Sequence, residues 1–176
     1  MVEILKSVFF VSLNLRGPDS LPGSRGMLAM CLIPWAAVSV TSNLMLHPGE
    51  QVAALAAAVL ELALLFGYPW LVLRMAEKLE RWPQTVVSLV GVQALIAAIS
   101  LPFTYLAEGR DEPGLLLTLA GIAFTAWWLL AAANIFARSV GRSVVVGLVL
   151  SACQFFFTLM AIVLLFQALG VLPGEA

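Results

Sequence analysis

The chain contains five long stretches in which apolar residues follow one another almost without interruption, each bounded by charged residues, Pro or Gly. A helix that crosses a hydrocarbon core of about 30 Å needs about 20 such residues. The composition agrees, because 62% of the 176 residues are apolar and only 11% are charged, whereas soluble proteins carry roughly 25% charge. We therefore predict an all-α membrane protein whose five transmembrane helices cover about residues 27–46, 52–75, 85–106, 115–137 and 144–169.

The segments that connect these stretches are short and rich in Pro, Gly and charged residues. Helices joined by so few residues pack beside their chain neighbours and run in opposite directions. We expect residues 27–176 to form one compact antiparallel bundle with no domain outside the membrane. Residues 1–26 form a separate N-terminal segment.

Positive charges are distributed unevenly between the two sides of the predicted bundle. Every Lys and Arg except Arg110 lies in the N-terminal segment or in the second-to-third and fourth-to-fifth connections. Because Lys and Arg near a span resist translocation, we predict a cytoplasmic N-terminus and an external C-terminus. The excess of Arg over Lys, with abundant Ala, Leu and Val, indicates a GC-rich bacterial genome and hence the bacterial inner membrane. The net charge of -1 gives no basic field for nucleic acid.

The first fifteen residues are too few to span, yet they show the pattern of an amphipathic helix. Glu3, Ser7 and Asn14 fall on one side of a helical wheel, and Val8 and Val11 fall on the other. We predict a helix in the cytoplasmic interface whose polar side stays in water and whose valines face lipid or a partner. A disordered leader is the alternative.

Residues that could carry enzyme chemistry are almost missing from the sequence. His47 is the single His, so one chain cannot supply two axial His ligands for haem. Cys31 and Cys153 lie in different spans without the C-x-x-C spacing of a zinc site. The chain has no phosphate-binding loop or nucleophile elbow. We expect no enzyme activity, no cofactor and no metal.

Glu61 is the one ionisable residue deep inside a predicted span, where charge costs a few kcal/mol and usually faces the bundle interior. Counting about 1.5 Å per residue from the cytoplasmic end of each span gives a candidate polar layer: Asn43 at about 24 Å, Ser100 at about 22 Å, Glu61 at about 21 Å, Gln154 at about 15 Å and Gln93 at about 12 Å. The layer has two interpretations. Glu61 is a proton- or cation-coupled site, or it is a protonated side chain that fixes helix packing through hydrogen bonds. The lack of a second deep charged residue favours packing.

Small residues four positions apart recur along the spans, and such pairs allow helix backbones to approach closely. They are Ala54/Ala58, Ala94/Ala98, Gly121/Thr125 and Gly147/Ser151.

An N-terminal segment with Arg16-Gly17-Pro18-Asp19, followed by five closely spaced spans, resembles small bacterial membrane proteins of the Yip-like type. The resemblance implies a non-enzymatic protein that acts through contacts with proteins or lipids. We therefore predict an accessory or scaffold protein that contacts a membrane protein partner, or a further copy of itself, through its small-residue faces and N-terminal helix. The alternative is a small proton- or cation-coupled transporter or channel that uses Glu61.

Overall fold

The computed structural model describes residues 2–13, 17–18, 21, 23–46, 49–107 and 114–171. All regular structure in these ranges is helical, and they contain no strand. The elements are α1 (Val2–Ser12), α2 (Arg25–Leu46), α3 (Gln51–Met75), a 3-10 turn η2 (Leu79–Arg81), α4 (Trp82–Ala107), α5 (Leu115–Val140) and α6 (Val144–Ala168).

The prediction of five membrane-crossing helices is confirmed at the level of length and composition. Within the described ranges, α2 to α6 are the five helices long and apolar enough to span. Their ends differ from the predicted ones by a few residues, for local reasons. The Ser24 hydroxyl accepts a hydrogen bond from the Met27 N–H, which extends the start of α2. Gly141, at a φ of 71°, ends α5 later than expected because this left-handed conformation suits glycine.

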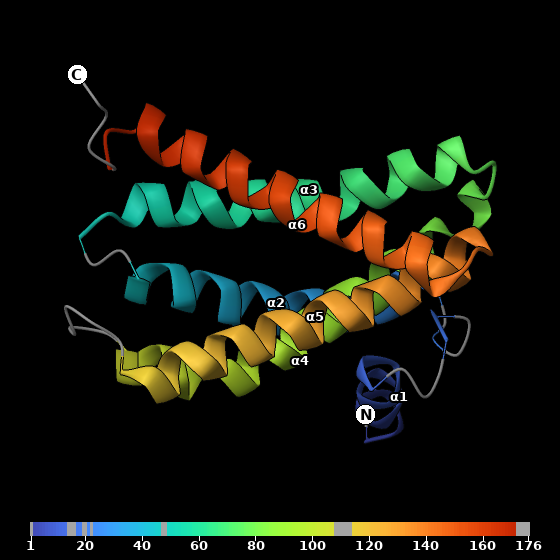
Figure 1. The fold of residues 1–176 in the computed structure, drawn as a ribbon, viewed down its shortest axis with the longest axis horizontal. Helices are drawn as coiled ribbons and strands as arrows, with labels where there is room; N and C mark the ends of the chain where they lie inside the picture. Colours follow the sequence, from blue (N-terminus) through green and yellow to red (C-terminus); the bar gives the residue numbers. More distant parts are fainter. Residues whose placement is uncertain are drawn as a thin grey trace.

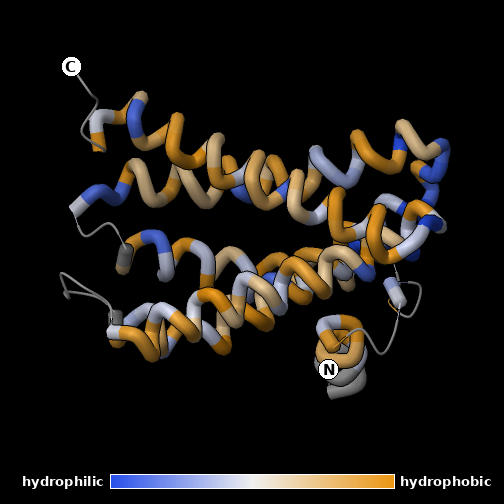
Figure 2. The backbone as a smooth tube through the Cα atoms, in the orientation of Figure 1, coloured by the Kyte–Doolittle hydropathy of each residue, from blue (hydrophilic) through white to orange (hydrophobic). Residues whose placement is uncertain are grey.

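The chain passes back and forth along the long axis of the molecule through these five helices (Figure 1). We call the end that carries η2 and the α5–α6 turn the Arg81 end. Hydrophilic residues gather there, whereas apolar residues colour most of the helices between the two ends (Figure 2). Many large apolar side chains on α5 and α6 point away from the bundle, including Leu116, Val145 and Phe156. Such a surface suits hydrocarbon rather than water.

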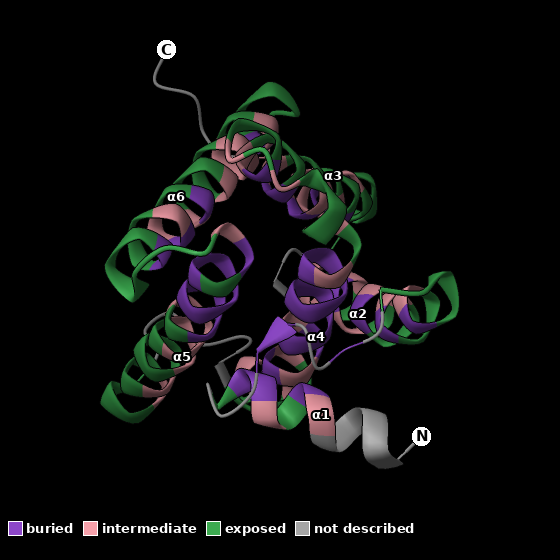
Figure 3. Cartoon of the chain, turned by 90° about the vertical axis from the view of Figure 1, so that its right-hand side faces the viewer, coloured by how far each residue is buried: buried purple, intermediate pink, exposed green. Residues whose placement is uncertain are grey.

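Helix α4 forms the centre of the packing. It contacts α1, α2, α3 and α5, and its first half is buried almost continuously over residues 85–92. Figure 3 shows this buried half beside α2 and α1. The core therefore lies towards the Arg81 end rather than at the middle of the bundle.

Helices α5 and α6 are closest near the Arg81 end. A Cβ atom on Gly147 would lie 1.9 Å from the Ala133 carbonyl oxygen, so only glycine permits this approach. The start of α4 holds the same region, because the Thr85 hydroxyl donates to the Ser139 hydroxyl over 2.7 Å. From the contact at Gly147, α5 and α6 diverge towards the opposite end of the molecule (Figures 1 and 3).

Helix α1 lies crosswise to the long helices (Figure 1) and packs against α4 and α5. The predicted orientation of its valines is wrong, because Val8 is 5% exposed and Val11 is 0% exposed within the chain's own core. Gly91 of α4 provides the room, since a Cβ there would lie 3.2 Å from Val8. The Trp127 indole of α5 donates to the Ser12 carbonyl over 2.9 Å.

The exposed side of α1 carries Phe9 and Leu13 instead. The side chain of Glu3, and Asn14 as a whole, were predicted to be wet and lie outside the described part. The wheel separated two faces of α1, but it could not tell which apolar residues meet protein and which meet the surroundings.

Candidate functional site

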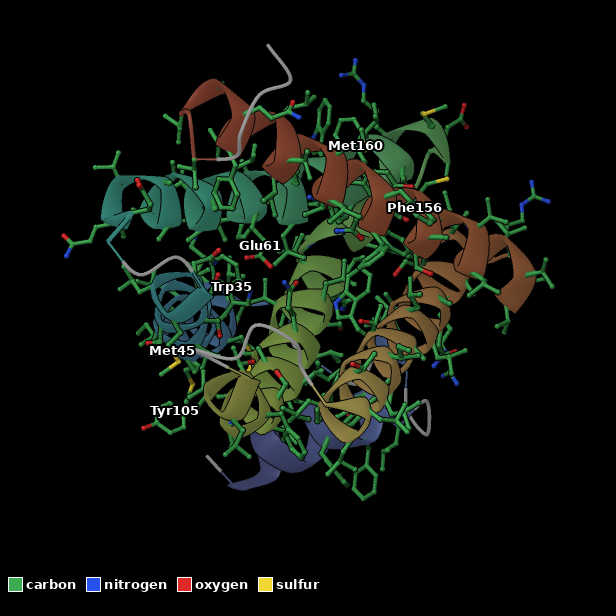
Figure 4. The ribbon with its side chains drawn as sticks, turned by 60° about the vertical axis from the view of Figure 1, so that its left-hand side comes forward. Trp35, Met45, Glu61, Tyr105, Phe156 and Met160 are labelled. Atoms are coloured by element: carbon green, nitrogen blue, oxygen red, sulfur yellow. The ribbon has the colours of Figure 1, made fainter. Side chains whose placement is uncertain are left out.

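A cavity of about 340 Å³ lies among α3, α4, α5 and α6. Its wall residues lie about 15 to 27 Å from the Arg81 end, counted along each helix at about 1.5 Å per residue, which is the middle of the predicted spans. Glu61 of α3 borders it, and in Figure 4 this side chain points into the bundle, whereas Tyr105 points outwards. We call this space the Glu61 cavity.

The cavity exists because α5 and α6 diverge beyond their contact at Gly147 and because the wall uses several short side chains. Ala97 and Ser100 of α4, Thr125 of α5 and Thr158 of α6 leave space that longer side chains would fill. Towards the Arg81 end, a hydrogen bond joins α3 to α6. There the Tyr68 hydroxyl of α3 donates to the Leu150 carbonyl of α6 over 2.9 Å.

Two neutral side chains hold the Glu61 carboxyl group from two other helices. The Ser39 hydroxyl of α2 donates to Oε2 over 2.8 Å, and the Gln93 amide of α4 donates to Oε1. Hydrogen bonds to both oxygens fix the orientation of the carboxyl group. A carboxyl group has about four lone-pair positions, so these two donors leave acceptor capacity on it.

The Gln154 side chain of α6 forms a second polar point on the wall. The residue is 3% exposed, and its Oε1 atom is buried without a hydrogen-bond partner. Buried amide oxygens are nearly always paired, since leaving one unpaired costs about 1–3 kcal/mol. A donor that enters the cavity, from a water or from a solute, would complete the pairing of this acceptor.

Two of the hydroxyl groups on the described wall, those of Ser100 and Thr125, direct their hydrogens away from the cavity. The Ser100 hydroxyl donates to the Ala97 carbonyl over 3.0 Å, and the Thr125 hydroxyl donates to the Gly121 carbonyl over 2.9 Å. Each hydroxyl oxygen keeps its lone pairs. The polar part of the wall thus has spare acceptors at several positions.

Four of the five residues of the predicted polar layer border the cavity: Glu61, Gln93, Ser100 and Gln154. Asn43 does not, since α2 supplies none of the described residues on the wall. Its amide donates to the Ser39 carbonyl of its own helix over 2.9 Å. Sequence reasoning missed Ser39, although it lies about 18 Å along its predicted span at 1.5 Å per residue, close to the level of Glu61. The same depth count would have found it.

Aromatic side chains cover the α5 and α6 side of the cavity, and they too were missed. Phe124 and Trp128 of α5 and Phe155 of α6 line it. The Trp128 and Phe155 ring centroids lie 6.2 Å apart. Most of the wall is therefore apolar. Its amide and carboxyl groups lie on α3, α4 and the start of the α6 part of the wall, and single threonines lie on α5 and α6.

The described residues contain no cluster of three or more His, Cys, Asp or Glu side chains that could hold a metal ion. Compared with models of protein families, with curated proteins and with solved structures, the chain has no match.

Proposed function

We propose that this chain is a membrane protein of the transporter class, which binds a small solute inside the bilayer in the Glu61 cavity. The observation that carries the proposal is that one cavity has both Glu61 and the Gln154 Oε1 atom, which has no hydrogen-bond partner among the described residues, on its wall. A volume of about 340 Å³ falls within the range of small-molecule sites, about 300–1,000 Å³.

The depth of the cavity supports this class. Substrate sites of many transporters lie near the middle of the bilayer, where helices meet and polar groups face a shared space. An intramembrane ionisable residue is a functional candidate by default. Glu61 meets that description together with its cavity, whereas a purely structural carboxyl group would need only its two hydrogen-bond donors.

The accessory role expected from the sequence is the second candidate, and one observation favours it. Gly121 of α5 faces outwards with nothing within 4 Å of the position of a Cβ atom, so another helix could approach there. The other small-residue pairs support this role less. Gly147 and Ser151 are buried inside the chain, as are Ala54 and Ala58.

We also propose that the protein resides in a bacterial inner membrane with the Arg81 end in the cytoplasm, because Lys and Arg gather at that end. In this orientation α1 lies in the cytoplasmic leaflet. Phe9 and Leu13 then face lipid.

Reporter fusions test this orientation. A fusion at Arg81 or Ser139 should give a cytoplasmic signal, and a fusion at Glu50 or after Val171 should give an external one. A cytoplasmic signal after Val171 would contradict both the span count and the orientation.

Filling the cavity tests the binding function. Three probes carry a phenyl ring on a two-carbon chain and differ in charge: phenylethylammonium, phenylethanol and phenylacetate. A bound solute raises the midpoint of unfolding by mass action, so at least one probe should stabilise the purified protein in mild detergent. Ala97→Phe places a ring in the cavity and should abolish that shift, whereas Ala98→Phe, on the exposed side of the same helix, should keep it.

The result that would overturn the proposal is a shift that persists in Ala97→Phe, or no shift with any of the three probes. Recovery of one defined membrane protein with the chain in mild detergent, lost in Gly121→Leu, would then favour the accessory role.

A further inference from the structure

We infer that the solute bound in the Glu61 cavity is an organic ammonium ion with an apolar body, and that it exchanges with a proton on Glu61. The inference rests on the proposed function and names its substrate class. Its basis is the balance of charge, donors and acceptors on the cavity wall.

The charge on the wall can have only one sign. Among the residues that the structure describes, Glu61 is the single ionisable one that borders the cavity, and no Lys, Arg or His of that set lines it. The side chains that contact Glu61 are the neutral Ser39 of α2 and Gln93 of α4. Trp128 of α5 and Gln154 of α6, which line the same cavity, are neutral as well. An anion would find no countercharge here, whereas a cation would find the carboxylate.

Most of the hydrogen-bonding capacity described for the wall is acceptor capacity, which favours a ligand with donors. The Gln154 Oε1 atom is buried without a partner, and the Glu61 carboxyl group keeps lone pairs beyond the two that Ser39 and Gln93 occupy. The hydroxyl hydrogens of Ser100 and Thr125 point to carbonyl groups of their own helices. An ammonium group has several N–H donors and no acceptor, so it complements this wall.

The rest of the wall fixes the remainder of the ligand. Phe124, Trp128 and Phe155 present rings to the same space, and aromatic faces attract organic cations and apolar groups. A bare divalent metal ion does not fit, because such an ion needs about six oxygen ligands and most of this wall is carbon. The ligand therefore combines one cationic donor group with an apolar body of moderate size.

Exchange follows from the cost of isolated charge in the bilayer. With the cavity empty, Glu61 carries a proton. When the ammonium ion binds, the Glu61 O–H bond breaks and the proton leaves, so that R–NH₃⁺ plus Glu–COOH gives the ion pair R–NH₃⁺·Glu–COO⁻ plus H⁺. The charge of the site is zero before and after, and one proton is released for each cation bound.

The three probes measure the charge preference directly. Phenylethylammonium should bind at least tenfold more tightly than phenylethanol, and phenylacetate should bind most weakly. Trimethylation of the ammonium removes its N–H donors while the charge remains, and should weaken binding several-fold. In lightly buffered detergent solution, binding of phenylethylammonium should release about one proton per protein.

Two variants assign the effect to the wall. Glu61→Gln should reduce phenylethylammonium affinity at least tenfold and abolish proton release, whereas Glu50→Gln, which neutralises an exposed acid at the start of the same helix, should change neither. Gln154→Leu should weaken binding of the ammonium ion more than binding of the trimethylated ion, because only the ammonium ion donates a hydrogen bond to the amide oxygen. This variant keeps Glu61 and its partners, so it tests the inference even if Glu61→Gln does not fold.

Equal or tighter binding of phenylethanol or phenylacetate in the cavity, lost in Ala97→Phe, would overturn the cation assignment and leave the proposed function standing. Cation binding without proton release would overturn the exchange step. If Ala97→Phe abolishes the binding of none of the probes, the proposed function fails together with this inference.

Discussion

Replacing Gly147 by Ala is expected to separate the α5–α6 contact and cost about 1–3 kcal/mol of stability, the usual cost of overpacking a rigid contact. The added Cβ would lie 1.9 Å from the Ala133 carbonyl oxygen and 2.9 Å from the Ala137 Cβ. These atoms belong to the helix backbone or begin a side chain, so they cannot rotate away. The helices must move apart instead, and the floor of the Glu61 cavity moves with them.

The matched control is Gly121→Ala on α5, where nothing lies within 4 Å of the new atom. Both changes add one methyl group at a helical glycine, so their intrinsic helix propensities change equally. Unfolding in mixtures of mild and denaturing detergent should show a large loss for Gly147→Ala and little change for Gly121→Ala. Equal stabilities would mean that α5 and α6 do not meet at Gly147.

Replacing Val11 by Asp is expected to detach α1 from the bundle. Val11 is fully buried among core residues, and burying an unpaired carboxylate costs several kcal/mol, more than the contacts of one short helix can offset. The Trp127 indole then loses the Ser12 carbonyl as its acceptor. The five long helices should still insert, since their own apolar length determines insertion.

Maleimide labelling measures this detachment. In a protein whose native Cys31 and Cys153 are replaced, a cysteine at position 8 should be protected, because Val8 is buried against α4. Adding Val11→Asp should expose it, whereas adding Val11→Ala, which only removes methyl groups, should leave it protected. Reactivity at position 8 without any change at Val11 would contradict the docked position of α1.

The spans could be predicted from the sequence because the membrane requirement is simple. Length and hydropathy determine it, and neither depends on which helix packs beside which. The ends of α2 and α5 differed because Ser24 and Gly141 act locally at the termini. The packing of α1 was harder to predict, because an apolar face of a short helix can contact either lipid or protein. The contact with protein depends on the space that Gly91 of α4 leaves for Val8, and the sequence does not show which residues lie opposite each other.

The candidate site was predictable in depth and not in rotation. Counting residues along the spans placed Glu61, Ser100 and Gln154 at related levels, and all three border the cavity. The count says nothing about the direction of a side chain around its helix, so Asn43 was included and Ser39 was not. The aromatic part of the wall was missed for the same reason, because Trp128 differs from Trp127 only by its rotation about α5.

Helix α6 is in close contact with α5 near its start and diverges from α5 along the rest of its length. The close contact is that of Gly147 with Ala133. Phe166, near the other end of α6, lies about 28 Å from Gly147 at 1.5 Å per residue. At that end, Phe166 forms a small cluster with Ala53 and Ala57 of α3, and Ile162, Leu165 and Val171 pack against this cluster. If α6 tilts by about 5° about Gly147, Phe166 moves by about 2.5 Å over this length. The far half of α6 can therefore change its distance from α5 with a small tilt, whereas the contact at Gly147 leaves no room for the two helices to come closer.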